Sequence, residues 1–142
     1  PKPLQQPRPP IIIGGSAKPR TVRAAVAYAD EYNTSGSVEE ARQRRRLLDE
    51  ASSAAGRQSL RYSIMLTCVV GRDKAEAAER LRAWRDILGS EDEPQLYGTV
   101  DEVAARLREY EEAGVDRAML IHFVHEDTEM VSLLGEVAAQ LT

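Results

Sequence analysis

Cysteine is almost missing from this sequence of 142 residues, because Cys68 is the only one. A single thiol cannot close an internal disulfide, and its place in the apolar run Ile64–Val70 predicts a buried cysteine with a structural role. The chain also lacks any run of about 18 apolar residues, the length that a membrane helix needs. These absences exclude a disulfide-stapled scaffold and argue against a membrane protein.

Positive charge is not in surplus either. The chain carries 19 Lys and Arg against 23 Asp and Glu, for a net charge of −4, and the two signs are mixed along the same segments. No basic stripe is left for a nucleic-acid partner. With no secretion signal in the sequence, we expect a cytoplasmic protein. The sequence also has no nucleophile elbow, Walker loop or zinc-type cysteine cluster, which removes the common hydrolase, kinase and metalloprotease functions.

Proline is concentrated at the start, where five of the first ten residues are Pro. We therefore expect an extended lead over residues 1–10 and a folded domain over residues 11–142. Because the chain begins at Pro1 rather than Met, we also expect that a preceding part has been removed.

Short apolar runs then alternate with amphipathic segments. The order predicts strand, helix, strand, helix, strand, two helices, strand, helix. The strands are expected at 11–13, 30–34, 60–70 and 118–123. Helix starts are predicted from N-cap residues and capping boxes at Thr21, Ser37 with Glu40, Asp73 with Glu76, and Thr99 with Glu102.

This alternation predicts an α/β fold with parallel strands covered by helices, joined by right-handed crossovers. A complete (β/α)8 barrel takes about 250 residues. Residues 11–142, with about four βα units, therefore correspond to one half of such a barrel.

The first turn between strand and helix is the strongest candidate site. Gly14 and Gly15 expose backbone N–H groups beside a helix N-terminus, which suits an anion. Ser16 can add a hydroxyl, and Lys18 or Arg20 a positive charge. From spacing alone, a plain tight turn remains the alternative, since the full dinucleotide fingerprint is absent.

Two further positions carry polar side chains at the C-terminal ends of expected strands, where α/β barrels place their ligand loops. Asn33 and Thr34 follow the second strand; turns and caps are the alternative there. His122 and His125 lie at the fourth strand, where substrate lining or proton transfer competes with ordinary polar roles. Without a third ligand at a recognisable spacing, we expect no metal site.

The segment Pro9–Ser16, which reads PPIIIGGS, followed by Thr21–Asp30 and Asn33, resembles the luciferase-like monooxygenase superfamily, particularly its F420-dependent oxidoreductases. The similarity continues through Gly56-Arg57, Val69–Gly71, Tyr97–Val103 and Ala113–Arg117. It corresponds to the last four βα units, the C-terminal half of the family's TIM barrel.

The resemblance implies a role in binding the phosphate region of a cofactor for Gly14, Gly15, Ser16, Ala17 and, less directly, Lys18. It also suggests that Asn33 and Thr34 approach the cofactor tail. Family members bind FMN or the deazaflavin coenzyme F420 and catalyse hydride transfer or oxygen-dependent oxidation. We expect F420, with FMN as the alternative, and a small-molecule substrate near His122.

The resemblance also implies that much of the ring and substrate pocket belongs to the N-terminal half of the barrel, which is missing here. The isolated chain is therefore expected to be inactive, with activity restored in the full-length enzyme, and to self-associate. A non-catalytic half-barrel module, which covers its open sheet edges by self-association or with a protein partner, is the rival hypothesis. The sequence does not separate FMN from F420 or give the substrate.

Overall fold

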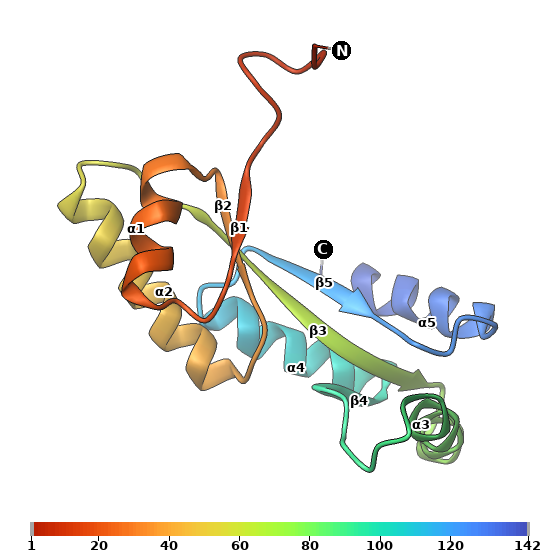
Figure 1. Cartoon of the computed structure of the whole chain (residues 1–142). Helices are drawn as coiled ribbons and strands as arrows, with labels where there is room; N and C mark the ends of the chain where they lie inside the picture. Colours follow the sequence, from red (N-terminus) through yellow and green to blue (C-terminus); the bar gives the residue numbers. More distant parts are fainter. Residues whose placement is uncertain (1, 142) are drawn as a thin grey trace. The chain divides into compact units, whose positions relative to one another are not determined.

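A computed structural model describes residues 2–141 of the chain (Figure 1). Within these residues the elements are β1 (Ile12–Gly14), α1 (Pro19–Tyr28), β2 (Glu31–Thr34), α2 (Val38–Ala54), β3 (Arg61–Gly71), α3 (Lys74–Leu88), β4 (Leu96–Thr99), α4 (Val100–Glu112), β5 (Arg117–Ile121) and α5 (Thr128–Ala139). The chain forms two compact units. The first runs through Ile64 and includes Ala113–Arg117; the second comprises Met65–Glu112 and the chain from Ala118 onward.

The first unit is built on a parallel ladder of β1, β2 and the start of β3. Ile13 pairs with Tyr32, which in turn pairs with Tyr62 of β3. Helices α1 and α2 pack together on one side of β1 and β2 (Figure 1). Their small residues Ala25 and Ala41 are fully buried, which lets these helices lie close to their neighbours.

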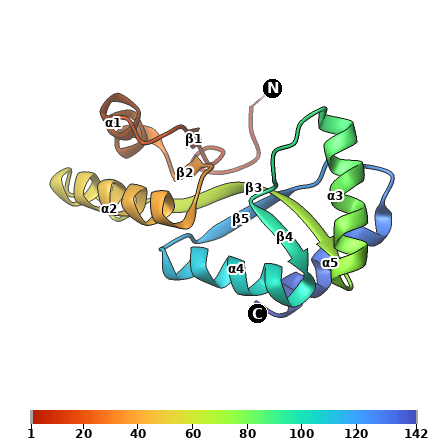
Figure 2. The ribbon, with the colours of Figure 1, turned by 90° about the horizontal axis from the view of Figure 1, so that it is seen from below.

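The second unit uses the rest of β3, which pairs in parallel with β4 so that Cys68 lies opposite Leu96. β5 also pairs with β3, and α3, α4 and α5 lie around these strands (Figure 2). Val69 packs against Trp84 of α3. Cys68 is fully buried, as predicted, and burial raises the pKa of its thiol to about 11.

The predicted α/β architecture of parallel strands and covering helices is confirmed. Three of the four predicted helix starts, at Ser37, Asp73 and Thr99, are also confirmed. Ser37 and Glu40 form a reciprocal capping box at α2, and Asp73 accepts a hydrogen bond from the backbone N–H of Glu76 at α3. No helix within residues 2–141 combines the length and apolar character needed to cross a membrane.

The predicted start of the first helix is wrong. α1 begins at Pro19, two residues before Thr21, and its N-cap is Lys18. Proline favours the first helical position because its fixed φ matches a helix and its missing N–H would have no helical partner there. Thr21 is therefore already inside the first turn and does not cap the helix.

The prediction of four strands missed β4. Residues 96–99 lie outside every strand that the sequence predicts, but Leu96–Thr99 pairs with Cys68–Gly71 of β3. Leu96 and Gly98 are buried and Tyr97 is exposed, so the strand does alternate, although over four residues only. Thr99 ends this strand and, together with Glu102, also forms the predicted capping box of α4.

Candidate functional site

The turn between β1 and α1 has an unusual backbone. Gly15 adopts a φ of 154° and Ala17 a φ of 55°, a region that favours glycine because an L side chain crowds its own carbonyl there. Among residues 2–141, Ala17 is the only residue other than glycine with a positive φ. Something outside the turn must therefore stabilise its conformation.

Tyr32 of β2 supplies that support. Its side chain is fully buried, and its hydroxyl oxygen accepts a hydrogen bond of 2.9 Å from the backbone N–H of Ala17. A Cβ placed on Gly15 would lie 3.2 Å from the same hydroxyl oxygen and 3.2 Å from Cγ2 of Thr21. A side chain at position 15 would thus be both crowded by Tyr32 and Thr21 and strained at its backbone.

The N-terminus of α1 differs from the other helix starts in the part of the chain that the structure describes. It has no side-chain cap and no acidic residue in its first turn. The other four helices each have a capping side chain and an acidic residue there. Within residues 2–141, the backbone N–H groups of Ser16, Arg20 and Thr21 donate to no protein acceptor. These amides, with the positive helix end and the exposed side chains of Lys18 and Arg20, can bind an anion.

The structure brings Asn33 next to the glycine turn. Asn33 pairs with Gly14, and its backbone carbonyl accepts a 3.0 Å hydrogen bond from the N–H of Gly15. Its side-chain amide donates to Oγ of Ser63 at 2.9 Å. Asn33 thereby ties the end of β1 to β2 and β3.

Thr34 lies one residue further along β2 and is buried. Its hydroxyl and that of Tyr62 are 3.0 Å apart and share a hydrogen bond. The contact of Asn33 and Thr34 with a cofactor tail stays a prediction, and the bonds described here show how both side chains are held.

His122 belongs to the second unit and directly follows β5. Its Nδ1 atom is buried and has no hydrogen-bond partner within residues 2–141. The ring of His125 lies 6.0 Å away, centroid to centroid. No group of three or more potential metal ligands occurs in that part of the chain. Nδ1 of His122 therefore has no polar contact among the described residues, and its burial keeps it from solvent as well.

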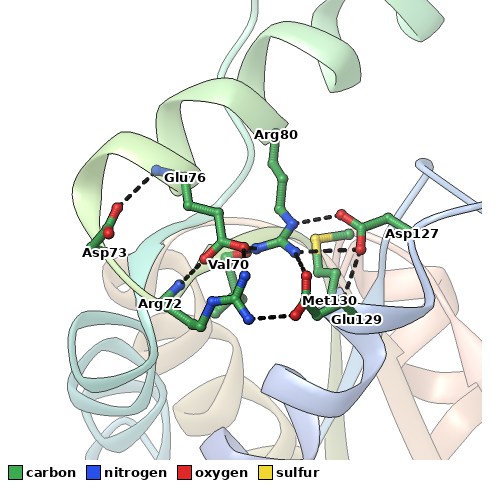
Figure 3. Close-up of polar contacts among 8 residues, drawn as sticks. All are labelled: Val70, Arg72, Asp73, Glu76, Arg80, Asp127, Glu129 and Met130. Atoms are coloured by element: carbon green, nitrogen blue, oxygen red, sulfur yellow. Dashed lines mark hydrogen bonds and ion pairs between the residues drawn. The ribbon is translucent and has the colours of Figure 1, made fainter.

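An ion network at the start of α3 and α5 was not predicted (Figure 3). At its centre is Arg80, whose side chain is 8% exposed. Its guanidinium contacts carboxylate oxygens of Glu76 at 2.8 Å, Asp127 at 2.5 Å and Glu129 at 3.4 Å. It also donates to the backbone carbonyl of Val70 at 3.1 Å.

The Arg80 network fixes the loop that carries His122. Asp127 ends that loop and caps α5 by accepting a hydrogen bond from the N–H of Met130. Arg80 holds the pKa of the Asp127 carboxyl below its usual value, chiefly through their hydrogen bond. Loop and cap are thus tied to α3 by one buried cation.

The sequence gives only weak signals for the Arg80 network and for the contact of Tyr32 with the glycine turn. Glu76 and Arg80 are four residues apart, a spacing typical of a helical ion pair, but the partners from the β5–α5 loop are distant in sequence. The sequence does not single out Tyr32, because an alternating strand pattern does not tell where a hydroxyl points.

Comparison with known proteins gives one family. The model of the luciferase-like monooxygenase family matches residues 1–97, which is more than half of the chain. No curated protein sequence matches.

Three solved structures illustrate the likeness in fold. The chain is similar to the monooxygenase RslO1 from Streptomyces bottropensis, at 18% identity and a TM-score of 0.72 over 96% of this chain and 49% of that chain. It is similar to the coenzyme F420 dependent tetrahydromethanopterin reductase from Methanopyrus kandleri, at 14% identity and a TM-score of 0.68 over 89% and 49%. It is also similar to the oxygenating constituent of 3,6-diketocamphane monooxygenase from Pseudomonas putida, solved in complex with FMN, at 14% identity and a TM-score of 0.72 over 94% and 49%. The chain thus spans about half the length of these structures, which agrees with the predicted half of a barrel.

Proposed function

Because this chain belongs to the luciferase-like monooxygenase family, we propose that it supplies the phosphate-binding part of the cofactor site of a flavin- or F420-dependent oxidoreductase. The observation that carries this proposal is the start of α1. Backbone N–H groups at Ser16, Arg20 and Thr21 have no protein acceptor in the described chain, and no carboxylate occupies the first helical turn. A phosphate group satisfies such donors and interacts favourably with the helix dipole.

The residues present fit a phosphate-bearing cofactor. Gly14, Gly15, Ser16 and Ala17 form the turn, and Lys18 is the N-cap of α1. Asn33 is joined to the turn through the Gly15 hydrogen bond, with Thr34 beside it. We propose F420 as the cofactor and FMN as the alternative, since one similar structure is named as F420 dependent and another contains FMN.

The whole reaction needs more than this chain. The chain covers about half of each similar structure, so hydride transfer or oxygenation is proposed for the full-length protein, in which a second barrel half completes the pocket. His122, which is half-buried and directly follows β5, is the proposed contact for a polar group of a small substrate. We expect the chain alone to be inactive and the complete protein to be cytoplasmic and to form homo-oligomers.

The phosphate site can be tested with ligands that differ only in the phosphate. Riboflavin is FMN without this group, so the ratio of the two Kd values isolates its contribution. We expect the chain to bind FMN at least about tenfold more tightly than riboflavin, the difference that one or two charge-assisted hydrogen bonds supply. F420 and its phosphate-free deazaflavin form a second pair of probes, which differs by the phosphate together with the tail that the phosphate carries.

A matched pair of glycine variants tests where the phosphate binds. Gly15→Ala places a Cβ against Tyr32 and Thr21, at a strained φ, and should remove the preference for FMN. Gly56 also has a positive φ, but a Cβ there meets nothing within 4 Å, so Gly56→Ala should leave the preference intact. Equal Kd values for FMN and riboflavin in the unmodified chain, with the same result for the F420 pair, would refute the proposed function.

One observation favours the alternative of a self-associating module. β1 lies at the end of the strand order β1-β2-β3-β4; Ile11, just before it, and Ile12, its first residue, are 38% and 47% exposed. An open apolar strand edge readily pairs with another chain. A dimer whose mass by light scattering is unaffected by FMN or F420, and which binds neither, would support the module over the enzyme.

A further inference from the structure

Tyr32 joins a strand of the first unit to the proposed phosphate turn. It lies on β2 opposite Ile13, and its ring is fully buried. A buried phenol needs a hydrogen-bond partner, and the partner here is a main-chain group of the turn, the N–H of Ala17. The hydroxyl therefore acts on the backbone of the turn and not on another side chain.

Ala17 is where that bond is needed. Its φ of 55° lies in the left-handed region, which an alanine occupies less readily than the right-handed one by about tenfold. The turn leads directly into the N-cap Lys18 and the first turn of α1. The direction of the Ser16 amide and of the first helical amides thus depends on Ala17 keeping this conformation.

Gly15 lies against the same hydroxyl oxygen. A Cβ on Gly15 would be 3.2 Å from the Tyr32 hydroxyl oxygen, and the Gly15 N–H is held by the Asn33 carbonyl. Tyr32 and Asn33 are adjacent on β2, so one short strand holds the turn by two hydrogen bonds, one accepted by a carbonyl oxygen and one by a phenol oxygen.

We propose that Tyr32 is the positioning residue of the phosphate turn. Its hydroxyl holds Ala17 in the left-handed conformation and so directs the free amides of Ser16, Arg20 and Thr21 at a phosphate group. Tyr32 itself does not touch the ligand. This inference rests on the proposed function, because it assigns a role in the same site.

Tyr62 provides a matched control. It pairs with Tyr32 across the β2–β3 ladder and is also fully buried. Its hydroxyl shares a hydrogen bond with Thr34 and not with the turn. Replacing either tyrosine by phenylalanine removes one buried hydroxyl from the same sheet and the same unit, but only Tyr32→Phe frees Ala17.

The experiment measures Kd values of the chain for FMN and riboflavin by flavin fluorescence, with F420 and its phosphate-free deazaflavin as the second pair. Tyr32→Phe should weaken binding of the phosphate-bearing member about tenfold, the equivalent of one hydrogen bond and its backbone consequence, and leave the phosphate-free member unchanged. Tyr62→Phe frees the Thr34 side chain and not the turn, so it should weaken FMN binding clearly less than Tyr32→Phe does. Amide NMR shifts of Ser16, Arg20 and Thr21 on adding inorganic phosphate should likewise appear in the unmodified chain and in Tyr62→Phe and be reduced in Tyr32→Phe.

A second substitution separates positioning from a general loss of stability. Glycine accepts a positive φ without the penalty of alanine, so adding Ala17→Gly to Tyr32→Phe should recover part of the lost phosphate affinity. A merely destabilised protein would not recover in this way, because glycine adds no packing.

Three results would overturn the inference while the proposed function stands: unchanged FMN affinity in Tyr32→Phe, equal losses in Tyr32→Phe and Tyr62→Phe, or equal losses for FMN and riboflavin. If the unmodified chain shows no preference for either phosphate-bearing cofactor and phosphate shifts none of the three amides, the proposed function fails, and the role of Tyr32 fails with it.

Discussion

Arg80 offers the sharpest test of the energetics of the second unit. Its side chain is 8% exposed and bonds Glu76, Asp127 and Glu129 (Figure 3). Arg80→Met keeps much of the side-chain length but removes the only buried cation among these carboxylates. Breaking a buried ion pair by deleting one partner costs about 3 to 5 kcal/mol. Because Glu129 is half exposed and can turn to water, we expect about 3 kcal/mol, the lower end of that range.

Arg72 is the matched control for this substitution. It contacts the same carboxylates of Glu76 and Glu129, yet its side chain is 60% exposed, so water replaces most of what it contributes. Arg72→Met should therefore change stability only slightly, and less still in high salt. Urea unfolding can be followed by the fluorescence of Trp84, the single tryptophan, which is buried on α3.

The pH dependence gives the Arg80 prediction a second readout. Arg80 lowers the pKa of Asp127 from its ordinary value of 3.8. Stability from a lowered carboxyl pKa is present above the ordinary value and is lost as the pH falls through the folded-state pKa. The stability gap between the unmodified chain and Arg80→Met should thus narrow below about pH 4. A cost no larger than that of Arg72→Met, or a gap that does not narrow in acid, would refute the reasoning.

Three further predictions concern packing and reactivity. Gly71→Ala should destabilise the chain by about 3 kcal/mol in urea unfolding, because a Cβ there would lie 2.3 Å from the backbone nitrogen of Ala77; a neutral result would contradict this close approach. Gly135→Ala, on α5 where a Cβ meets nothing within 4 Å, should instead stabilise by about 0.5 to 1 kcal/mol through helix propensity. The Cys68 thiol, with a pKa raised to about 11 by burial, should not react with a thiol reagent at pH 8 until urea unfolds the chain, and rapid labelling of the folded chain would show that β3 opens.

Local patterns predicted the helices well for a physical reason. A capping box places both of its hydrogen bonds within three residues, so Ser37 with Glu40 and Thr99 with Glu102 determine a helix start whatever lies around them. The prediction of Thr21 as an N-cap was wrong because two local signals competed. The preference of Pro19 for the first helical position outweighed that of the threonine for an N-cap.

β4 could not be predicted in the same way. Its four residues are too few for an alternating pattern to be distinguished from a loop. Its stability comes from pairing with Cys68–Gly71, about 28 residues earlier in the sequence. Strand propensity depends mainly on such neighbours. Of the remaining strands, β3 and β5 are longer than β4, and β1 was predicted from three successive isoleucines that end at paired glycines.

The candidate site, too, was predictable only in the part that local sequence determines. Glycines after an apolar run are visible in the sequence, so Gly14 and Gly15 could be proposed for an anion site. What distinguishes an anion site from a plain turn is whether the amides are already used, and that is decided by contacts across strands. The Ala17 N–H is taken by Tyr32 and the Gly15 N–H by Asn33, which leaves the donors at Ser16 and in the first turn of α1 for a ligand. The glycine pattern therefore indicates where an anion site can lie, while β2 determines which amides remain available to a ligand. A search for phosphate turns in related chains should therefore ask whether a tyrosine occupies the position of Tyr32.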